Sequence, residues 1–97
     1  MLGFSKRRSF YGSLRKLYPD LTDEELLALE YFITNISVGE IIAVRELEDL
    51  VGIKDPRSVL DSLIEKGFIE RGERCYNLSR SVREELKKLG LLGNRRF

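Results

Sequence analysis

Residues 44–78 read VRELEDLVGIKDPRSVLDSLIEKGFIERGERCYNL, and this stretch decides the fold. Apolar residues recur every three or four positions over 44–51 and 56–66, which predicts two helices, the first with Leu47, Leu50 and Val51 on its buried face. Gly52 is placed to take the left-handed conformation that closes the first helix and forms a tight turn. Asp55 is a good N-cap for the second helix, and the proline after it suits the first helical position.

A β-hairpin is predicted directly after the second helix, over residues 68–78. Gly72 is expected at its tip, because glycine suits a tight turn that requires positive φ. The β-branched run at residues 41–44 predicts a brief strand before the first helix. Helix, turn, helix and hairpin in this order predict an α+β fold.

A further helix is expected to precede this stretch. Thr22 and Glu25 have the spacing of a capping box, and Leu21 is placed to pack on Leu26 as a hydrophobic staple. The apolar stripe that follows predicts a helix ending near Ile36.

The two ends of the chain each predict one more helix. Residues 9–18 have amphipathic spacing and stop at Pro19, because the residue before a proline is pushed out of the helical region. Near the C-terminus, Ser81 and Glu84 suggest a second capping box, and Gly90 would close that helix. Its predicted apolar face consists of Val82, Leu86 and Leu89.

The chain has 97 residues, 42% apolar and 34% charged, which is enough for one domain. We divide it into a basic aromatic arm (1–19), a folded domain (20–90) and a tail (91–97). No apolar run approaches the roughly 20 residues that span a bilayer, and no signal peptide is recognisable. A cytoplasmic protein without a membrane partner is therefore expected.

Few residues are of the types that support catalysis, disulfide formation or metal binding. The sequence has no histidine, and its single cysteine, Cys75, cannot form an internal disulfide or a cysteine zinc cluster. Cys75 is interpreted as a structural residue of a strand, with a redox sensor as the alternative. The acidic groups at 23–25 and 48–49 are interpreted as compensation of helix dipoles, not as metal sites. We predict a protein that is not an enzyme and has no cofactor.

The charges are segregated along the chain. Residues 1–18 carry five basic and no acidic residues, and residues 71–97 carry a balance of +5. Residues 19–70 carry 13 acidic and four basic residues, a balance of −9. A binding hypothesis must explain an acidic middle between basic ends.

The segments LEDLVGI (47–53) and LIEKGFIER (63–71) resemble the turn and the helix-to-wing junction of archaeal and bacterial winged helix-turn-helix proteins. The resemblance covers about residues 22–90. It implies a winged helix-turn-helix with an extra basic N-terminal helix and a C-terminal helix. It also implies that the second helix of the turn enters the major groove of DNA, while wing arginines reach the minor groove or the backbone.

Candidate DNA-binding residues follow from this resemblance and from the basic arm, whose cations could lie along phosphates. The alternative for the arm is a basic amphipathic helix docked on the acidic body, with its aromatic side chains in the core. The candidate residues are Lys6, Arg7, Arg8, Arg15, Lys16, Arg57, Ser58, Arg71 and Arg74.

The second helix of the turn departs from the family pattern. DNA-binding faces are normally strongly positive, because neutralising phosphates supplies much of the affinity. Here Asp61 and Glu65 would meet phosphates with repulsion unless they accept hydrogen bonds from cytosine. The polar face of this helix comprises Arg57, Ser58, Asp61, Ser62, Glu65 and Lys66.

Two functions remain open. The first is a winged-helix transcriptional regulator that binds double-stranded DNA, as a homodimer if the C-terminal apolar face is exposed. The second is a small accessory subunit that docks through its acidic body onto a replication or transcription enzyme. The frequency of the fold among regulators favours the first, and the charge segregation favours the second.

Overall fold

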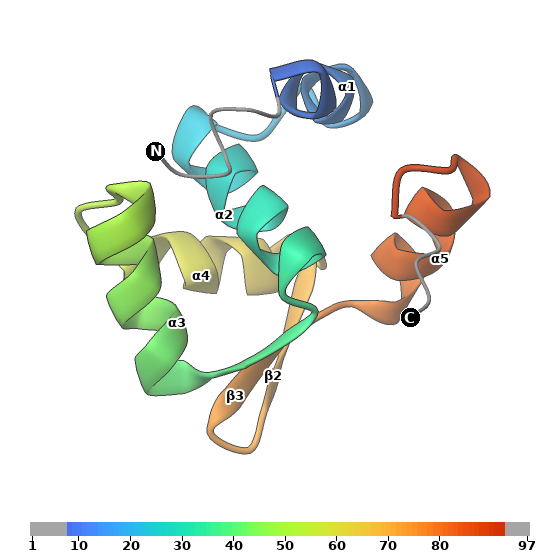
Figure 1. Cartoon of the computed structure of the whole chain (residues 1–97). Coiled ribbons are helices and arrows are strands. Elements are labelled where there is room, and N and C mark those ends of the chain that lie inside the picture. Colours follow the sequence, from blue (N-terminus) through green and yellow to red (C-terminus); the bar gives the residue numbers. More distant parts are fainter. Residues whose placement is uncertain (1–7, 93–97) are drawn as a thin grey trace.

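A computed structural model describes residues 8–92, with the side chains of residues 11–92. The architecture is α+β and winged-helix-like, with one additional helix at each end, as the sequence predicts (Figure 1). In chain order the elements are α1 (Arg8–Leu17), α2 (Asp23–Thr34), β1 (Ser37–Gly39), α3 (Glu40–Glu46), a π-helical turn (Leu47–Val51), α4 (Pro56–Glu65), β2 (Ile69–Gly72), β3 (Cys75–Leu78) and α5 (Arg80–Lys88).

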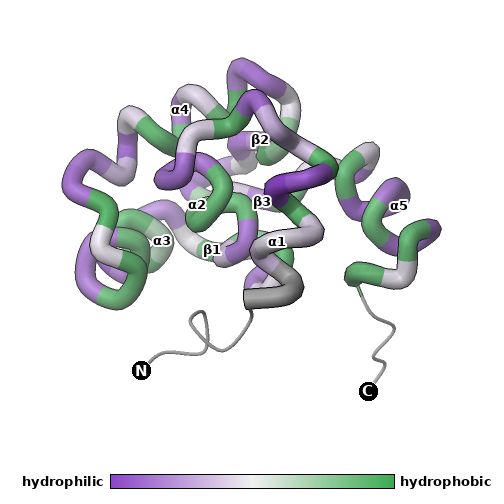
Figure 2. Tube along the Cα trace, turned by 90° about the horizontal axis from the view of Figure 1, so that it is seen from above, coloured by the Kyte–Doolittle hydropathy of each residue, from purple (hydrophilic) through white to green (hydrophobic). Residues whose placement is uncertain are grey.

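The core gathers around α2, which lies among α1, α4, β3 and the π-helical turn (Figure 2). The predicted capping box is confirmed: the Thr22 hydroxyl accepts from the Glu25 amide at 3.1 Å, and Glu25 accepts from the Thr22 amide at 2.9 Å. Leu21 and Leu26 are both buried, as the staple requires. The helix ends at Thr34, slightly before the predicted Ile36.

The sheet is antiparallel with strand order β1-β3-β2. Gly72 pairs with Cys75, so the hairpin turns through two residues, Glu73 and Arg74. The prediction of positive φ at Gly72 is wrong, since Arg74 takes that conformation, with φ 60°. Space is limited at position 72 instead, because an added Cβ would lie 2.8 Å from the Cys75 Sγ atom and would force a neighbouring side chain to shift.

The strand predicted at residues 41–44 is wrong. The strand in this region is β1, whose Val38 pairs with Tyr76 of β3, and α3 begins at Glu40. The Glu40 amide donates to the Arg74 carbonyl at 2.9 Å, so the chain leaves the sheet there. Long-range pairing of β1 overrides the β propensity of the residues that follow.

The helix ends at Gly52 and Asp55 follow the predicted local signals, whereas the start of α5 does not. Gly52 closes the π-helical turn with φ 89°, and Asp55 accepts from the Ser58 amide at 3.3 Å, as predicted. The cap predicted at Ser81 is wrong. Ser79 caps α5 instead, with its hydroxyl accepting from the Val82 amide at 3.4 Å. Both serines have the spacing for a cap, but Ser79 directly follows the last residue of β3.

The arm is helical and docks on the body. Leu14 is fully buried, and the Tyr18 ring lies edge-on to Phe68 with 4.9 Å between ring centroids. The Tyr18 hydroxyl donates to Glu85 of α5 at 2.9 Å, and burial together with this carboxylate raises the pKa of Tyr18 to about 12. The docked-helix alternative therefore holds for Tyr18, while the side chain of Phe10 is outside the described residues.

The predicted C-terminal apolar face is largely used within the chain. Val82 and Leu86 are buried in the core, and Leu91 and Leu92 pack against it. Leu89, expected on the same face, is 51% exposed.

Glu25 joins α2 to α4. The residue is only 5% exposed, and its carboxylate accepts from the Lys66 ammonium at 2.8 and 3.0 Å and from the Ser62 hydroxyl. Burial alone would raise the pKa of Glu25, but the hydrogen bonds from Lys66, Ser62 and the Thr22 amide outweigh it and lower the pKa to about 2. The carboxylate therefore fixes where α4 sits against the start of α2.

We expect Glu25→Gln to destabilise the fold by about 1.5–3 kcal/mol, the range for hydrogen bonds to charged groups. Because folding lowers the Glu25 pKa, its contribution is present above its ordinary value of 4.5 and is lost as the pH falls towards about 2. Urea unfolding at several pH values should show a weaker loss of stability from pH 5 to 2 in the variant than in the wild type.

Glu24→Gln is the matched control, because Glu24 is exposed in the same first turn of α2. It should cost less than about 1 kcal/mol. Equal losses in the two variants would contradict the role given to Glu25.

Candidate functional site

Side chains around Glu40 connect α3, α4 and the β2–β3 hairpin, which corresponds to the wing of a winged helix. The Arg57 guanidinium donates to the Glu40 carboxylate at 2.7 Å, and the Arg71 guanidinium lies 3.5 Å from the same oxygen. The hydrogen bond from Arg57, followed by the charge of Arg71, lowers the pKa of Glu40 despite some desolvation. Two of the predicted DNA-binding residues, Arg57 and Arg71, are therefore paired with the same carboxylate of the chain, that of Glu40.

Arg71 is held a second time by the sheet. Its guanidinium carbon lies 5.1 Å from the centre of the Tyr76 ring, and it donates to the Tyr76 hydroxyl at 3.4 Å. A cation over an aromatic face is attracted by the ring quadrupole. Arg71 is thus engaged on the body of the domain by Glu40 and Tyr76.

The outward face of α4 is acidic. Ser62 and Lys66, which the sequence places on its polar face, instead turn towards the buried carboxylate of Glu25. Ser58, Asp61 and Glu65 remain exposed on the outer side of the helix. This helix would enter the major groove in a DNA-reading winged helix, and here it presents two carboxylates there.

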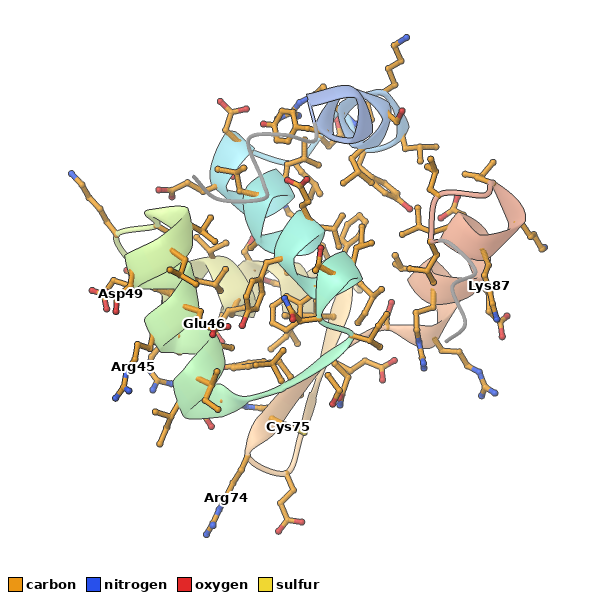
Figure 3. All side chains as sticks on the ribbon, viewed as in Figure 1. Arg45, Glu46, Asp49, Arg74, Cys75 and Lys87 are labelled. Atoms are coloured by element: carbon orange, nitrogen blue, oxygen red, sulfur yellow. The ribbon has the colours of Figure 1, made fainter. Side chains whose placement is uncertain are left out.

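The remaining predicted DNA-binding residues are dispersed. Arg15 pairs with Asp23 at 2.8 Å and donates to the Leu21 carbonyl at 2.6 Å, so it fastens α1 to the start of α2. Lys16 is exposed on α1, and Arg74 projects from the hairpin tip (Figure 3). Lys6, Arg7 and the side chain of Arg8 are outside the described residues.

The outer side of α3 and its π-helical turn is the most apolar exposed surface. Of four large apolar side chains exposed among residues 11–92, three lie there: Ile41 (69%), Ile42 (56%) and Leu50 (50%). Arg45, Glu48 and Asp49 are exposed on the same segment. We call these six residues the α3 face.

The inner side of this segment is firmly anchored. Ala43 and Leu47 are buried, and the Tyr31 hydroxyl of α2 donates to the Glu46 carboxylate at 2.6 Å. Burial, with the nearby Glu46 carboxylate, raises the pKa of Tyr31. Figure 3 shows Arg45 and Asp49 pointing away from the body, whereas Glu46 points towards α2.

The π-helical turn accounts for the exposure of Leu50, which the sequence predicts on the buried face of a regular helix. The Gly52 amide donates to the Leu47 carbonyl five residues earlier, so the turn holds one residue more than an α-helical turn. That extra residue rotates Leu50 out of the buried stripe. The α3 face is not foreseen from the sequence, which places Ile41 and Ile42 in a strand and Leu50 in the core.

Signs of other chemistry are few in the part of the chain that the structure describes. It contains no group of three or more histidine, cysteine or acidic side chains arranged to hold a metal ion. Cys75 is a half-buried free thiol in β3. Each helix among residues 8–92 is too short or too polar to span a membrane.

These features define a small winged-helix-like domain with an acidic outward helix and an exposed apolar face on α3. The chain belongs to the family described as PolB1 Binding Protein 2, whose model matches residues 22–84. The match begins at the N-cap of α2 and ends within α5, so it spans the acidic body and leaves out α1. A comparison with curated proteins finds no match.

The Glu40 cluster predicts that Glu40→Gln frees Arg57 and removes one of the two restraints on Arg71, while the contact of Arg71 with Tyr76 remains. Affinity for a labelled non-specific duplex should then rise several-fold at about 50 mM salt, and the slope of log affinity against log salt should steepen by roughly one to two. Fluorescence anisotropy measures both quantities.

Glu73→Gln at the hairpin tip is the matched control, since it removes the same charge without touching either arginine. If both variants raise the affinity equally, the effect comes from net charge, and Glu40 does not restrain the two arginines.

Proposed function

We propose that this protein is a small accessory subunit that binds a DNA polymerase of the PolB1 type. The observation that carries the proposal is the family match over residues 22–84, because the family is described by its binding to PolB1. The match covers about two thirds of the chain and includes the α3 face. The proposal gives the protein no catalytic step of its own, in line with a sequence that lacks histidine.

The electrostatics support docking on a protein more than direct reading of DNA. The outward face of α4 carries Asp61 and Glu65, and phosphates would repel both. Arg57 is engaged by Glu40, so the helix offers few free cations. A transcriptional regulator that reads the major groove through α4 is therefore the weaker hypothesis.

The α3 face has the composition of a docking surface. Protein interfaces combine an apolar centre with a polar rim, and here the three apolar residues of the α3 face lie beside Arg45, Glu48 and Asp49. A polymerase that holds a polyanionic duplex carries basic surface, and a rim with two carboxylates and one cation has a net charge of the matching sign. We assign the α3 face to an apolar, basic surface of the polymerase.

The scaffold behind this face favours binding without rearrangement. Leu47 is fully buried and Glu46 is hydrogen-bonded to Tyr31, so the segment is held on its inner side. A preformed surface loses less conformational freedom on association. Sequence features alone would not have selected this segment, because its anchoring comes from α2.

Binding to a purified PolB1-type polymerase, measured by isothermal titration calorimetry, tests the proposal. The wild-type chain should form a one-to-one complex. Ile41→Ser should weaken binding at least tenfold, which corresponds to about 1.4 kcal/mol for an apolar side chain near the centre of an interface. Leu89→Ser should have little effect, because Leu89 has comparable exposure but caps the end of α5, and α5 lies on the opposite side of the domain from α3 (Figure 1).

The accessory function and the choice of docking surface can be refuted separately. If the wild-type chain does not bind the polymerase, the accessory function is wrong. If it binds and Ile41→Ser binds equally well, the function stands and the α3 face is not the docking surface.

The acidic rim makes a second prediction. The double change Glu48→Gln and Asp49→Asn should slow association with the polymerase and reduce its dependence on salt, because rim charges act mainly on the encounter rate. Surface plasmon resonance at several salt concentrations separates the two rates. An unchanged association rate would contradict a basic partner surface.

A further inference from the structure

A basic ridge runs along α5. Arg80, Arg83 and Lys87 are spaced by three and four residues, so they lie on one side of the helix, and all three are exposed. Lys88 follows at about 100° around the helix and is not part of the ridge. These three cations are not among the DNA-binding residues predicted from the sequence.

The ridge borders a hollow of about 360 Å³. Its lining comprises the three cations, Glu84, and two apolar residues, Ile36 and Leu92. The lining therefore combines three cations and one acid with two apolar side chains, which is a net positive surface that suits an anionic chain.

The cations of the ridge are largely available. Glu84 is the one acid in the lining, and it lies 3.6 Å from the Arg80 guanidinium with both side chains mostly exposed. Such an exposed pair is weak. Within residues 11–92, Arg83 and Lys87 form no ion pair, unlike Arg57 and Arg71 of the expected DNA-reading face.

The ridge and the α3 face lie at opposite ends of the molecule. Figures 1 and 2 both place α3 at one edge of the domain and α5 at the other. A partner that covers Ile41 and Ile42 would therefore leave α5 open.

We propose that Arg80, Arg83 and Lys87 bind the phosphodiester backbone of a nucleic acid. The seven helical steps from Arg80 to Lys87 extend about 10 Å, which matches the axial rise of about three steps between phosphates on one strand, roughly 3.4 Å each. The planar guanidinium of arginine and the compact ammonium of lysine both bind phosphate oxygens well. Such contacts carry no sequence information. This site is independent of the polymerase docking proposed above.

The test uses the full chain and a labelled DNA duplex, with a single strand of equal length as a second arm. At about 50 mM salt, Arg83→Gln with Lys87→Gln should weaken binding at least fivefold. The double change should also reduce the salt slope by nearly two, about 0.9 for each phosphate that is no longer neutralised. Glutamine is a good helix former, so α5 should remain folded, and circular dichroism checks this.

Lys54→Gln with Lys88→Gln is the matched control, because it removes the same charge from exposed positions outside the ridge. It should change affinity less than twofold. Equal weakening by the two double variants overturns the site, since binding would then follow net charge.

Two further outcomes also overturn it. The first is absence of DNA binding by the wild-type chain at about 50 mM salt. The second is competition by polyglutamate as effective as competition by unlabelled DNA at equal charge, which would make the ridge a general acid-binding surface. Neither outcome bears on binding to the polymerase, which is measured without DNA.

Discussion

The buried carboxylate of Glu25 is the interaction on which the rest of the structure depends. It closes the capping box that starts α2, and it accepts hydrogen bonds from Ser62 and Lys66 of the α4 region. One ionised group thus sets the start of one helix and the orientation of another. With Lys66 bound to Glu25 and Arg57 paired with Glu40, Asp61 and Glu65 are the exposed charges of α4 that form no ion pair among the described residues.

The orientation of α4 makes this domain a poor match for DNA reading, which is the function that winged-helix folds most often serve. With α4 acidic outside and Arg57 tied to Glu40, the surface used for reading a major groove is poorly suited to phosphates. The binding features lie elsewhere, on the α3 face at one end and on the basic ridge of α5 at the other (Figure 1). The acidic middle and the basic C-terminal region of the sequence correspond to these two surfaces.

Local signals in the sequence predicted the helix starts at Thr22 and Asp55, because caps depend on residues three positions apart. They did not predict where α3 begins, since β1 is formed by pairing with Tyr76, far along the chain. The exposure of Leu50 depends on a π-helical turn, which leaves no periodic signal. The candidate site was only partly foreseen because it also depends on long-range contacts. Lys66 turns inward because it binds Glu25, which lies 41 residues earlier.

Hydroxyl-radical footprinting of the chain, free and bound to a PolB1-type polymerase, tests the central claim most directly. Ile41, Ile42 and Leu50 are exposed enough to be oxidised in the free protein, as is Leu89 on α5. We expect the polymerase to protect the first three and to leave Leu89 as reactive as before. Protection of Leu89 with continued oxidation of Ile41 and Ile42 would contradict docking through the α3 face.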